Sequence, residues 1–137
     1  MYPCLWYDGQ ARAAAEFYCT IFPNSKVVND TGMVVCFDLN GFPIMGLNGG
    51  DNFKFNEAVS FVIPCKDQGE IDYYWNSLIA GGGEESMCGW CKDKFGLSWQ
   101  VVPSNLGELM SQPEKGQRVV QAFMKMNKID IETLKNA

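Results

Sequence analysis

The residues best equipped for chemistry lie in one stretch of the chain, CGWCKDKFGLSWQVVP, residues 88–103. It contains the pair Cys88 and Cys91, followed by Ser98 and Gln100 among strand-forming residues. A C-x-x-C pair can support redox chemistry or bind zinc, and a hydroxyl with an amide can orient a small ligand. The chain contains no histidine. The commonest general base and the commonest metal ligand are therefore both missing.

The C-x-x-C pair is followed by a predicted hairpin. Trp90 to Lys92 and residues 98–102 read as its two arms, and residues 93–96 as the turn, in which Gly96 can adopt φ > 0. Redox activity would need Cys88 at a helix N-terminus to lower the pKa of its thiol, and zinc would need two further ligands nearby in sequence. We therefore interpret both thiols as inert.

The second arm of the hairpin alternates in polarity. Ser98, Gln100 and Val102 fall on one face of the predicted strand, and Trp99 and Val101 on the other. Polar groups opposite an aromatic face predict a cleft on the Ser98 side. Gln100 could orient a ligand there or satisfy a polar group of a neighbouring strand, because a buried amide must find partners either way.

Composition restricts the class of protein. The 137 residues carry a formal net charge of −5, with 47% hydrophobic and 20% charged residues, as expected for one folded domain. The acidic balance argues against nucleic-acid and membrane partners. No apolar run approaches the ~20 residues of a membrane helix, and we read no secretion signal, so we expect a cytoplasmic protein. The six cysteines then read as free thiols.

The order of predicted elements repeats along the chain. The first half predicts a strand at 3–7, a helix at 10–22, and strands at 26–29, 33–39 and 42–48. The second half predicts a strand at 59–65, a helix at 71–79 capped by Asp67, a short strand at 85–87 and the hairpin. Phe17-Tyr18 in the first helix corresponds to Tyr74-Trp75 in the second. We interpret this as a structural duplication.

The duplication predicts an α+β fold. Two βαβββ modules form a curved mixed sheet with outer helices, followed by a C-terminal helical tail. We predict a single domain over 1–137, with module one at 1–50, a linker at 51–57, module two at 58–103 and the tail at 104–137. In the tail, Pro113 suits the first turn of a helix, and Asp130 could cap a last short helix.

A duplicated βαβββ chain of this length resembles the vicinal oxygen chelate superfamily, which includes glyoxalases, bleomycin-resistance proteins and extradiol dioxygenases. The segments that look like its PhnB-like branch, whose members often carry the name 3-demethylubiquinone-9 3-methyltransferase, are PCLWYDG at 3–9, Phe17-Tyr18, LNGG at 47–50, FKFN at 53–56 and residues 88–103. The methyltransferase name gains no support from the residues, since the chain has no glycine-rich turn after a first parallel strand.

The resemblance implies a metal bound by one residue from each of several strands. Those positions fall here on Pro3, on Ser60 with Ala58 as the alternative register, and on Gln100. Proline has no ligand side chain, and serine and a neutral amide are poor ligands for divalent ions. We therefore predict no metal site and no cofactor.

Strand parity proposes a cleft of apolar residues with a few amides and hydroxyls. The predicted ligand-binding residues are Tyr7, Asn48, Ser60, Ser98 and Gln100, although the glycines after Asn48 favour a local backbone role for it. Catalytic residues cannot be assigned. The function predicted is binding of an unidentified small molecule, as in glyoxalase/bleomycin-resistance proteins, without the usual metal. The alternatives are a metal-dependent lyase or dioxygenase with unconventional ligands, and a dimeric interaction module with a vestigial cleft.

The resemblance also implies a homodimer. The sequence adds two arguments: Phe53 and Phe55 lie outside the predicted strands, and the tail carries an apolar set beyond a fold that the repeat has completed. Such groups either pack on their own subunit or bury against a partner. We expect the tail to help build the dimer, with packing of the tail on its own helices as the alternative. The tail's apolar set is Val119, Val120, Phe123, Met124 and Met126.

Overall fold

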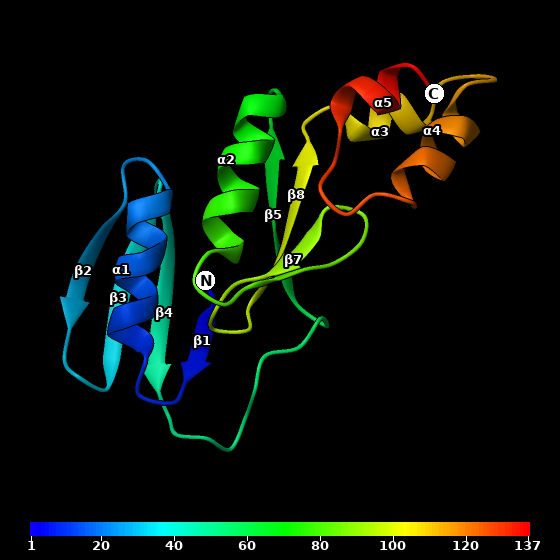
Figure 1. Ribbon diagram of the computed structural model, residues 1–137. Helices are drawn as coiled ribbons and strands as arrows, with labels where there is room; N and C mark the ends of the chain where they lie inside the picture. The colour runs from blue at the N-terminus through cyan, green and yellow to red at the C-terminus, as the bar shows by residue number, and fades with distance from the viewer. The chain divides into compact units, whose positions relative to one another are not determined.

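A computed structural model describes residues 1–137 and divides them into two units, Met1–Phe55 and Asn56–Ala137 (Figure 1). Each unit contains one four-stranded mixed sheet. No helix is long and apolar enough to cross a membrane.

The first unit is a complete βαβββ module. Its sheet has the strand order β1-β4-β3-β2, in which β1 runs parallel to β4 and the other neighbours are antiparallel. Helix α1 contacts β2, β3 and β4 (Figure 1). The elements are β1 (Cys4–Tyr7), α1 (Ala11–Ile21), β2 (Lys26–Asp30), β3 (Val34–Leu39) and β4 (Phe42–Asn48).

Helix α1 packs on the sheet through small residues and one tyrosine. Ala11, Ala14, Ala15 and Tyr18 are fully buried at the spacing of one helix face. The helix approaches β4 so closely that a Cβ added to Gly46 would lie 3.1 Å from the Ala11 Cβ. Glycine at this position therefore permits the close packing of α1 on the sheet.

The second unit repeats this topology. Its sheet has the order β5-β8-β7-β6, with β5 parallel to β8, and helix α2 contacts β5, β7 and β8. Asp67 caps α2 by accepting a hydrogen bond from the Glu70 amide at 2.9 Å, as predicted. The elements are β5 (Ser60–Cys65), α2 (Gln68–Ile79), β6 (Glu84–Glu85), β7 (Trp90–Lys92) and β8 (Ser98–Pro103).

The turn between β7 and β8 is organised around a buried carboxylate. Asp93 is 2% exposed, and its Oδ1 accepts hydrogen bonds from the Phe95 and Leu97 amides at 2.8 and 3.1 Å. Its Oδ2 accepts from the Trp99 indole at 2.8 Å. One side chain thereby fixes the hairpin turn and orients the aromatic ring that follows it.

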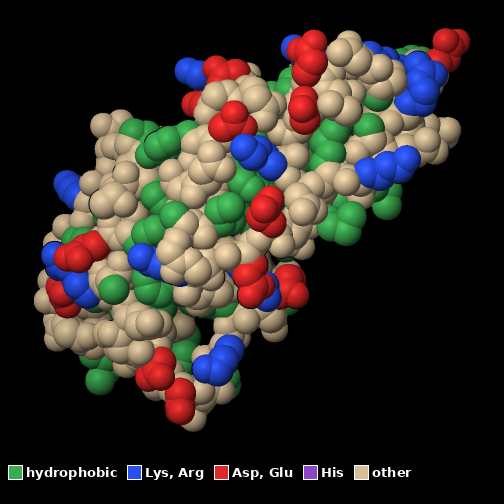
Figure 2. Space-filling view, in the orientation of Figure 1, with side chains coloured by type: hydrophobic (Ala, Val, Ile, Leu, Met, Phe, Trp, Pro, Cys, Tyr) green, Lys and Arg blue, Asp and Glu red, His purple; other side chains and the backbone are tan.

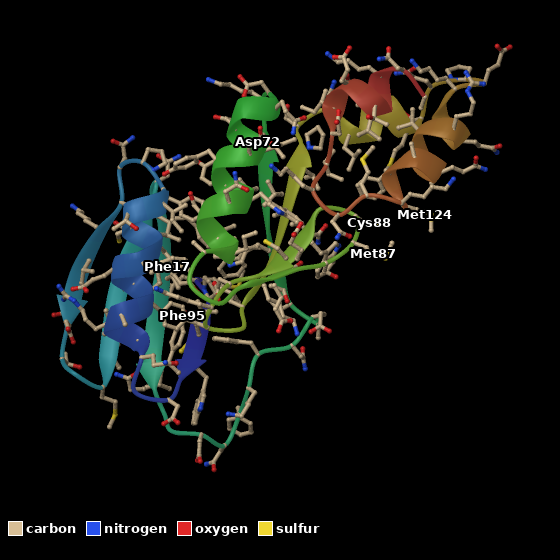
Figure 3. The ribbon with its side chains drawn as sticks, in the orientation of Figure 1. Phe17, Asp72, Met87, Cys88, Phe95 and Met124 are labelled. Carbon is tan, nitrogen blue, oxygen red and sulfur yellow. The ribbon has the colours of Figure 1, made fainter.

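The tail packs on its own unit. It contains α3 (Leu106–Met110), α4 (Gly116–Phe123) and α5 (Ile131–Lys135). Gln68 of α2 accepts a hydrogen bond from the Ile131 amide and donates to the Ile129 carbonyl, both at 2.9 Å. Lys128 pairs with Asp72 at 3.1 Å. Asp72 lies on α2 (Figure 3). Val119, Ile129 and Leu134 are fully buried.

The α+β class and the two βαβββ modules are confirmed, and Asp130 caps α5 through the Thr133 amide at 3.1 Å. One local prediction is wrong: Pro113 lies in the turn before α4, which begins at Gly116, because Glu114 adopts a positive φ of 67° that breaks the helical path.

Candidate functional site

In the second unit, the face of the sheet that carries the candidate residues lies opposite helix α2. The register pairs Ser60 with Ser98 and Val62 with Gln100, so these four side chains share one face. The alternate residues Ile63, Cys65 and Val101 are buried on the face that packs against α2. Val62 is 55% exposed, which shows that the Ser98 face is open within this unit.

In the first unit, the predicted parity is wrong by one residue. Tyr7 and Asn48 are register partners and share a face with Gly46, which lies against Ala11 of α1. The open face instead carries Cys4, Trp6 and Met45. The error arose because β1 is apolar on both faces, so its alternation gave no signal for which face the helix covers. The predicted ligand-binding residues Tyr7 and Asn48 therefore lie on the face that helix α1 covers.

The structure gives Tyr7 and Asn48 intramolecular partners. The Tyr7 hydroxyl lies 3.4 Å from the Tyr18 hydroxyl, and the side chain is 3% exposed. The Asn48 Oδ1 accepts from the Ala11 amide at 2.9 Å, and its Nδ2 donates to the Gly32 carbonyl at 2.8 Å. Because Gln10 provides no side-chain cap for α1, Asn48 supplies it from the end of β4.

Ser60, Ser98 and Gln100 are brought together on the open face of the second sheet. The Gln100 Nε2 donates to the Ser60 Oγ at 2.9 Å. Ser98 is 1% exposed, and its Oγ is buried without a hydrogen-bond partner. A buried hydroxyl without a partner costs stability, so it requires an explanation in terms of a water, an ion or a ligand.

Ser98 lines a pocket of about 170 Å³ whose walls all belong to the second unit. Because Lys92 and Ser98 are register partners, both extend from the open face. A cavity of about 150 Å³ is large enough for benzene, so this pocket suits a molecule of similar size. The lining residues are Glu57, Glu84, Glu85, Ser86, Trp90, Cys91, Lys92 and Ser98.

The pocket is acidic overall. Three glutamates and a single lysine line it, and the Lys92 Nζ lies 2.5 Å from the Glu57 Oε1. The hydrogen bond and the charge of Lys92 lower the pKa of Glu57, and the Glu57 carboxylate raises the pKa of Lys92. The pair is therefore ionised at neutral pH. It is lost as pH falls through the lowered pKa of Glu57 or rises through the raised pKa of Lys92.

Sequence reasoning missed most residues of this pocket. Glu84 and Lys92 are cross-strand partners on the open face, and Glu57 reaches Lys92 from the segment before β5. The alternation of β7 could have placed Lys92 beside the candidate residues, since Lys92 lies two residues after Trp90 and therefore on the same face of the strand. Nothing in the local sequence indicated the approach of Glu57.

The divalent metal implied by the fold does not fit the residues present. Pro3 offers no ligand atom, and the amide nitrogen of Gln100 is engaged by the Ser60 hydroxyl. No group of three or more histidine, cysteine, aspartate or glutamate side chains is close enough to hold a metal ion. A proline, a hydroxyl and an amide are a poor donor set for such ions.

Cys65 and Cys91 are buried, whereas the other four cysteines are exposed or partly exposed. Burial raises the pKa of each buried thiol to about 12, with further contributions from neighbouring carboxylates. No helix begins at the C-x-x-C pair: Cys88 lies in a loop with φ of 62°, beside Met87 (Figure 3). This geometry provides no support for a thiolate at Cys91.

We expect Cys65 and Cys91 to resist thiol reagents at pH 8 in the folded protein, whereas exposed Cys4 reacts faster than either. Labelling with iodoacetamide followed by peptide mass spectrometry measures each site. Labelling in denaturant serves as the control, since all six cysteines then react. Modification of Cys91 at the rate of Cys4 in the native protein would contradict the assignment.

Solved structures of several proteins resemble this chain. A PhnB protein from Bacillus cereus, described as a 3-demethylubiquinone-9 3-methyltransferase, is 28% identical over 74% of this chain and 98% of its own, with a TM-score of 0.67. Protein PA1353 from Pseudomonas aeruginosa is 18% identical over 75% and 96%, with a TM-score of 0.61. No curated protein sequence matches significantly.

A form of the fosfomycin resistance protein FosX from Listeria monocytogenes, complexed with Mn(II) and 1S,2S-dihydroxypropylphosphonic acid, is 16% identical over 82% of this chain and 96% of its own. Its TM-score is 0.58, and at this identity the likeness shows the fold alone. The paired βαβββ modules and these neighbours define a protein of the vicinal oxygen chelate superfamily.

The family model described as 3-demethylubiquinone-9 3-methyltransferase matches residues 1–102. The chain therefore belongs to this family.

Proposed function

We propose that the protein binds a small neutral or cationic molecule, without a divalent metal, in the pocket on the open face of the second sheet. The observation that carries the proposal is Ser98, a residue that lines the pocket and whose hydroxyl is buried without a hydrogen-bond partner. A ligand that hydrogen-bonds to this oxygen would satisfy it. Charge supports the choice of ligand, because the glutamates of the pocket outnumber Lys92 and disfavour an anion.

The remaining predicted residues take supporting roles in this proposal. Gln100 and Ser60 hydrogen-bond to one another on the same face, which supports a positioning role for that pair. The Trp90 side chain lines the pocket and provides an aromatic surface for an apolar or ammonium group. The proposal does not include methyl transfer. A site for a methyl-donating cofactor normally lies on a parallel α/β sheet, and both sheets here are mixed.

The test compares two serine variants. In Ser98→Ala the unpartnered hydroxyl is removed, so the free energy of unfolding should rise by about 1 kcal/mol, while binding weakens. In Ser60→Ala the Gln100 amide loses its acceptor, so the free energy of unfolding should fall by about 1 kcal/mol. Denaturant unfolding measures both changes.

Binding is measured by mass spectrometry of co-purifying small molecules, followed by melting shifts with the molecule recovered. Recovery of the same molecule, at the same occupancy, with the wild-type protein and with Ser98→Ala would contradict the proposed site. A stabilised Ser98→Ala variant with a weakened melting shift supports it.

We further propose that the 137 residues act as one domain in a cytoplasmic homodimer. Within the tail's apolar set, Val119 is buried in its own unit, whereas Met124 is 59% exposed and available to a partner. Phe53 is engaged in the first unit, with its ring edge on Trp6, although it is 65% exposed. Figure 2 shows lysine and arginine side chains interspersed with acidic ones on the visible face, which disfavours a nucleic-acid partner.

We expect sedimentation at micromolar concentration to give twice the chain mass of 15.3 kDa. Because Phe53, Val28 and Phe42 are large apolar side chains that are more than half exposed, substitution of each by serine tests the interface. A clean monomer at that concentration would refute the dimer.

A further inference from the structure

One row of side chains crosses the open face of the second sheet at the pocket. Lys92 of β7 is the register partner of both Ser98 in β8 and Glu84 in β6, so the three side chains extend from the same face. Opposite charges directly across two strands attract one another, which favours a Glu84–Lys92 ion pair. The Lys92 ammonium instead pairs with Glu57, and Glu84 takes part in no ion pair.

This choice of partner leaves one negative charge of the pocket uncompensated. Glu57 neutralises Lys92, whereas Glu84 is exposed and lines the pocket without a cation. Glu85 also lines the pocket, but it is the register partner of the buried Cys91 and extends from the opposite face of β6. The charge that a ligand meets on the open face is therefore that of Glu84.

Trp90 provides an aromatic surface beside this charge. It lies two residues before Lys92 on β7, on the same face, and it lines the pocket. The ring of Trp99 packs against Phe61, whereas no aromatic ring packs against Trp90. A cation is attracted to the face of an indole ring and to a carboxylate. Trp90 and Glu84 together therefore match a molecule that combines a cation with an apolar body.

The position of Ser98 in the row sets the length of such a molecule. Two strand spacings of about 4.8 Å put the backbones of Glu84 and Ser98 roughly 10 Å apart, so the ligand must be elongated to approach both. Its far end should carry a polar group, because the Ser98 hydroxyl is buried without a partner. A bare divalent ion does not fit, since it needs several converging oxygen ligands and no such group of side chains exists.

We propose that the pocket binds an organic ammonium ion, with its charge at Glu84, its apolar body against Trp90 and a hydroxyl or similar group at the end nearest Ser98. This inference rests on the function proposed above and names the class of ligand. Glu57 contributes by holding the Lys92 ammonium away from Glu84. The ligand's ammonium group takes the place opposite Glu84 that Lys92 would otherwise fill.

Tyramine is a suitable probe, because it carries an ammonium group, an aromatic body and a hydroxyl in a line. Two comparison molecules each change one end: tyrosol has a hydroxyl in place of the ammonium group, and phenethylamine lacks the phenol hydroxyl. NMR titration of the full-length chain measures each affinity. Tyramine should bind roughly 5–10-fold more tightly than tyrosol, since it gains an ion pair and a cation–π contact. Added salt should weaken the binding of tyramine but not of tyrosol.

Three substitutions assign the contacts. Glu84→Gln should weaken tyramine binding about 2–5-fold, the scale of an exposed ion pair, with Glu108→Gln on α3, outside the pocket, as the matched control. Lys92→Met removes the competing cation, so tyramine should bind more tightly, a gain that poor folding cannot produce. Ser98→Ala should remove the advantage of tyramine over phenethylamine.

The outcomes separate this inference from the function on which it rests. Equal affinities for tyramine and tyrosol, or equal losses in Glu84→Gln and Glu108→Gln, would overturn the ammonium assignment and leave the proposed pocket in place. If Ser98→Ala bound all three molecules as the wild-type protein does, the proposed pocket would be wrong as well. If none of the three bound to the wild-type protein, the ammonium assignment would be overturned and the proposed pocket would lose its support.

Discussion

Replacing Asp93 by alanine is expected to lower the free energy of unfolding by about 3–5 kcal/mol. The buried carboxylate accepts three hydrogen bonds, two from turn amides and one from the Trp99 indole. Bonds to a charged group contribute about 1.5–3 kcal/mol each, and bonds that share one residue are not additive. The substitution also leaves buried donors without partners. Denaturant unfolding monitored by tryptophan fluorescence measures the loss.

Asp67→Ala provides a matched aspartate control. Asp67 also accepts a backbone amide, but it is exposed and caps a helix, so its loss costs about 1 kcal/mol. The loss of unfolding free energy in Asp93→Asn should lie between those of the two alanine variants. An asparagine amide has one oxygen that can accept from the turn, whereas the carboxylate accepts at both oxygens. If Asp93→Ala and Asp67→Ala cost the same, the carboxylate does not organise the turn.

Deleting residues 113–137 is expected to prevent stable folding of the second unit. The deletion removes Val119, Ile129 and Leu134, each fully buried. Burial of such a side chain contributes about 1.5–3 kcal/mol, so the three together approach the whole stability of a typical domain, about 5–15 kcal/mol. Gln68 also loses both backbone partners in the tail. Circular dichroism and cooperative thermal melting measure the result.

Two substitutions within the tail distinguish the effect on stability of losing a buried side chain from that of losing an exposed one. Met124→Ala changes a side chain that is 59% exposed and should alter stability by about 0.5 kcal/mol or less. Ile129→Ala should cost about 2–5 kcal/mol, since it leaves a cavity beside Gly89, whose position lies close to the Ile129 side chain. A truncated chain that still melts cooperatively at the wild-type temperature would show the tail to be dispensable.

The element order could be predicted from the sequence because local signals agreed with the fold. Asp67 with Glu70, the glycines at 81–83 and the turn at 93–96 each specify a boundary by local chemistry. The observed strand Phe42–Asn48 has the predicted bounds. These signals depend on neighbours within a few residues, which a sequence displays directly.

Which face of a strand points outward could be predicted only where polarity alternates. The serine and glutamine of β8 indicated correctly which of its faces is open. Strand β1 gave no such indication, because both of its faces are apolar in Cys4, Leu5, Trp6 and Tyr7. Helix α1 determines which face of β1 is buried, because its small alanine side chains leave room for Tyr7 and Gly46 beneath them. The approach of Glu57 to Lys92 and the missing partner of Ser98 likewise arise from packing between distant segments.

The parallel pairing at one edge of each sheet has a consequence for synthesis on the ribosome. Cys4 pairs with Met45, and Ser60 pairs with Ser98, so the strand made first in each module is the last to find its partner. The antiparallel pairs β2–β3 and β3–β4 connect segments close in sequence and can form earlier, because their loop-closure entropy is smaller. The parallel edge of each sheet is therefore completed only when β1 or β5 docks, in the final step of folding its module.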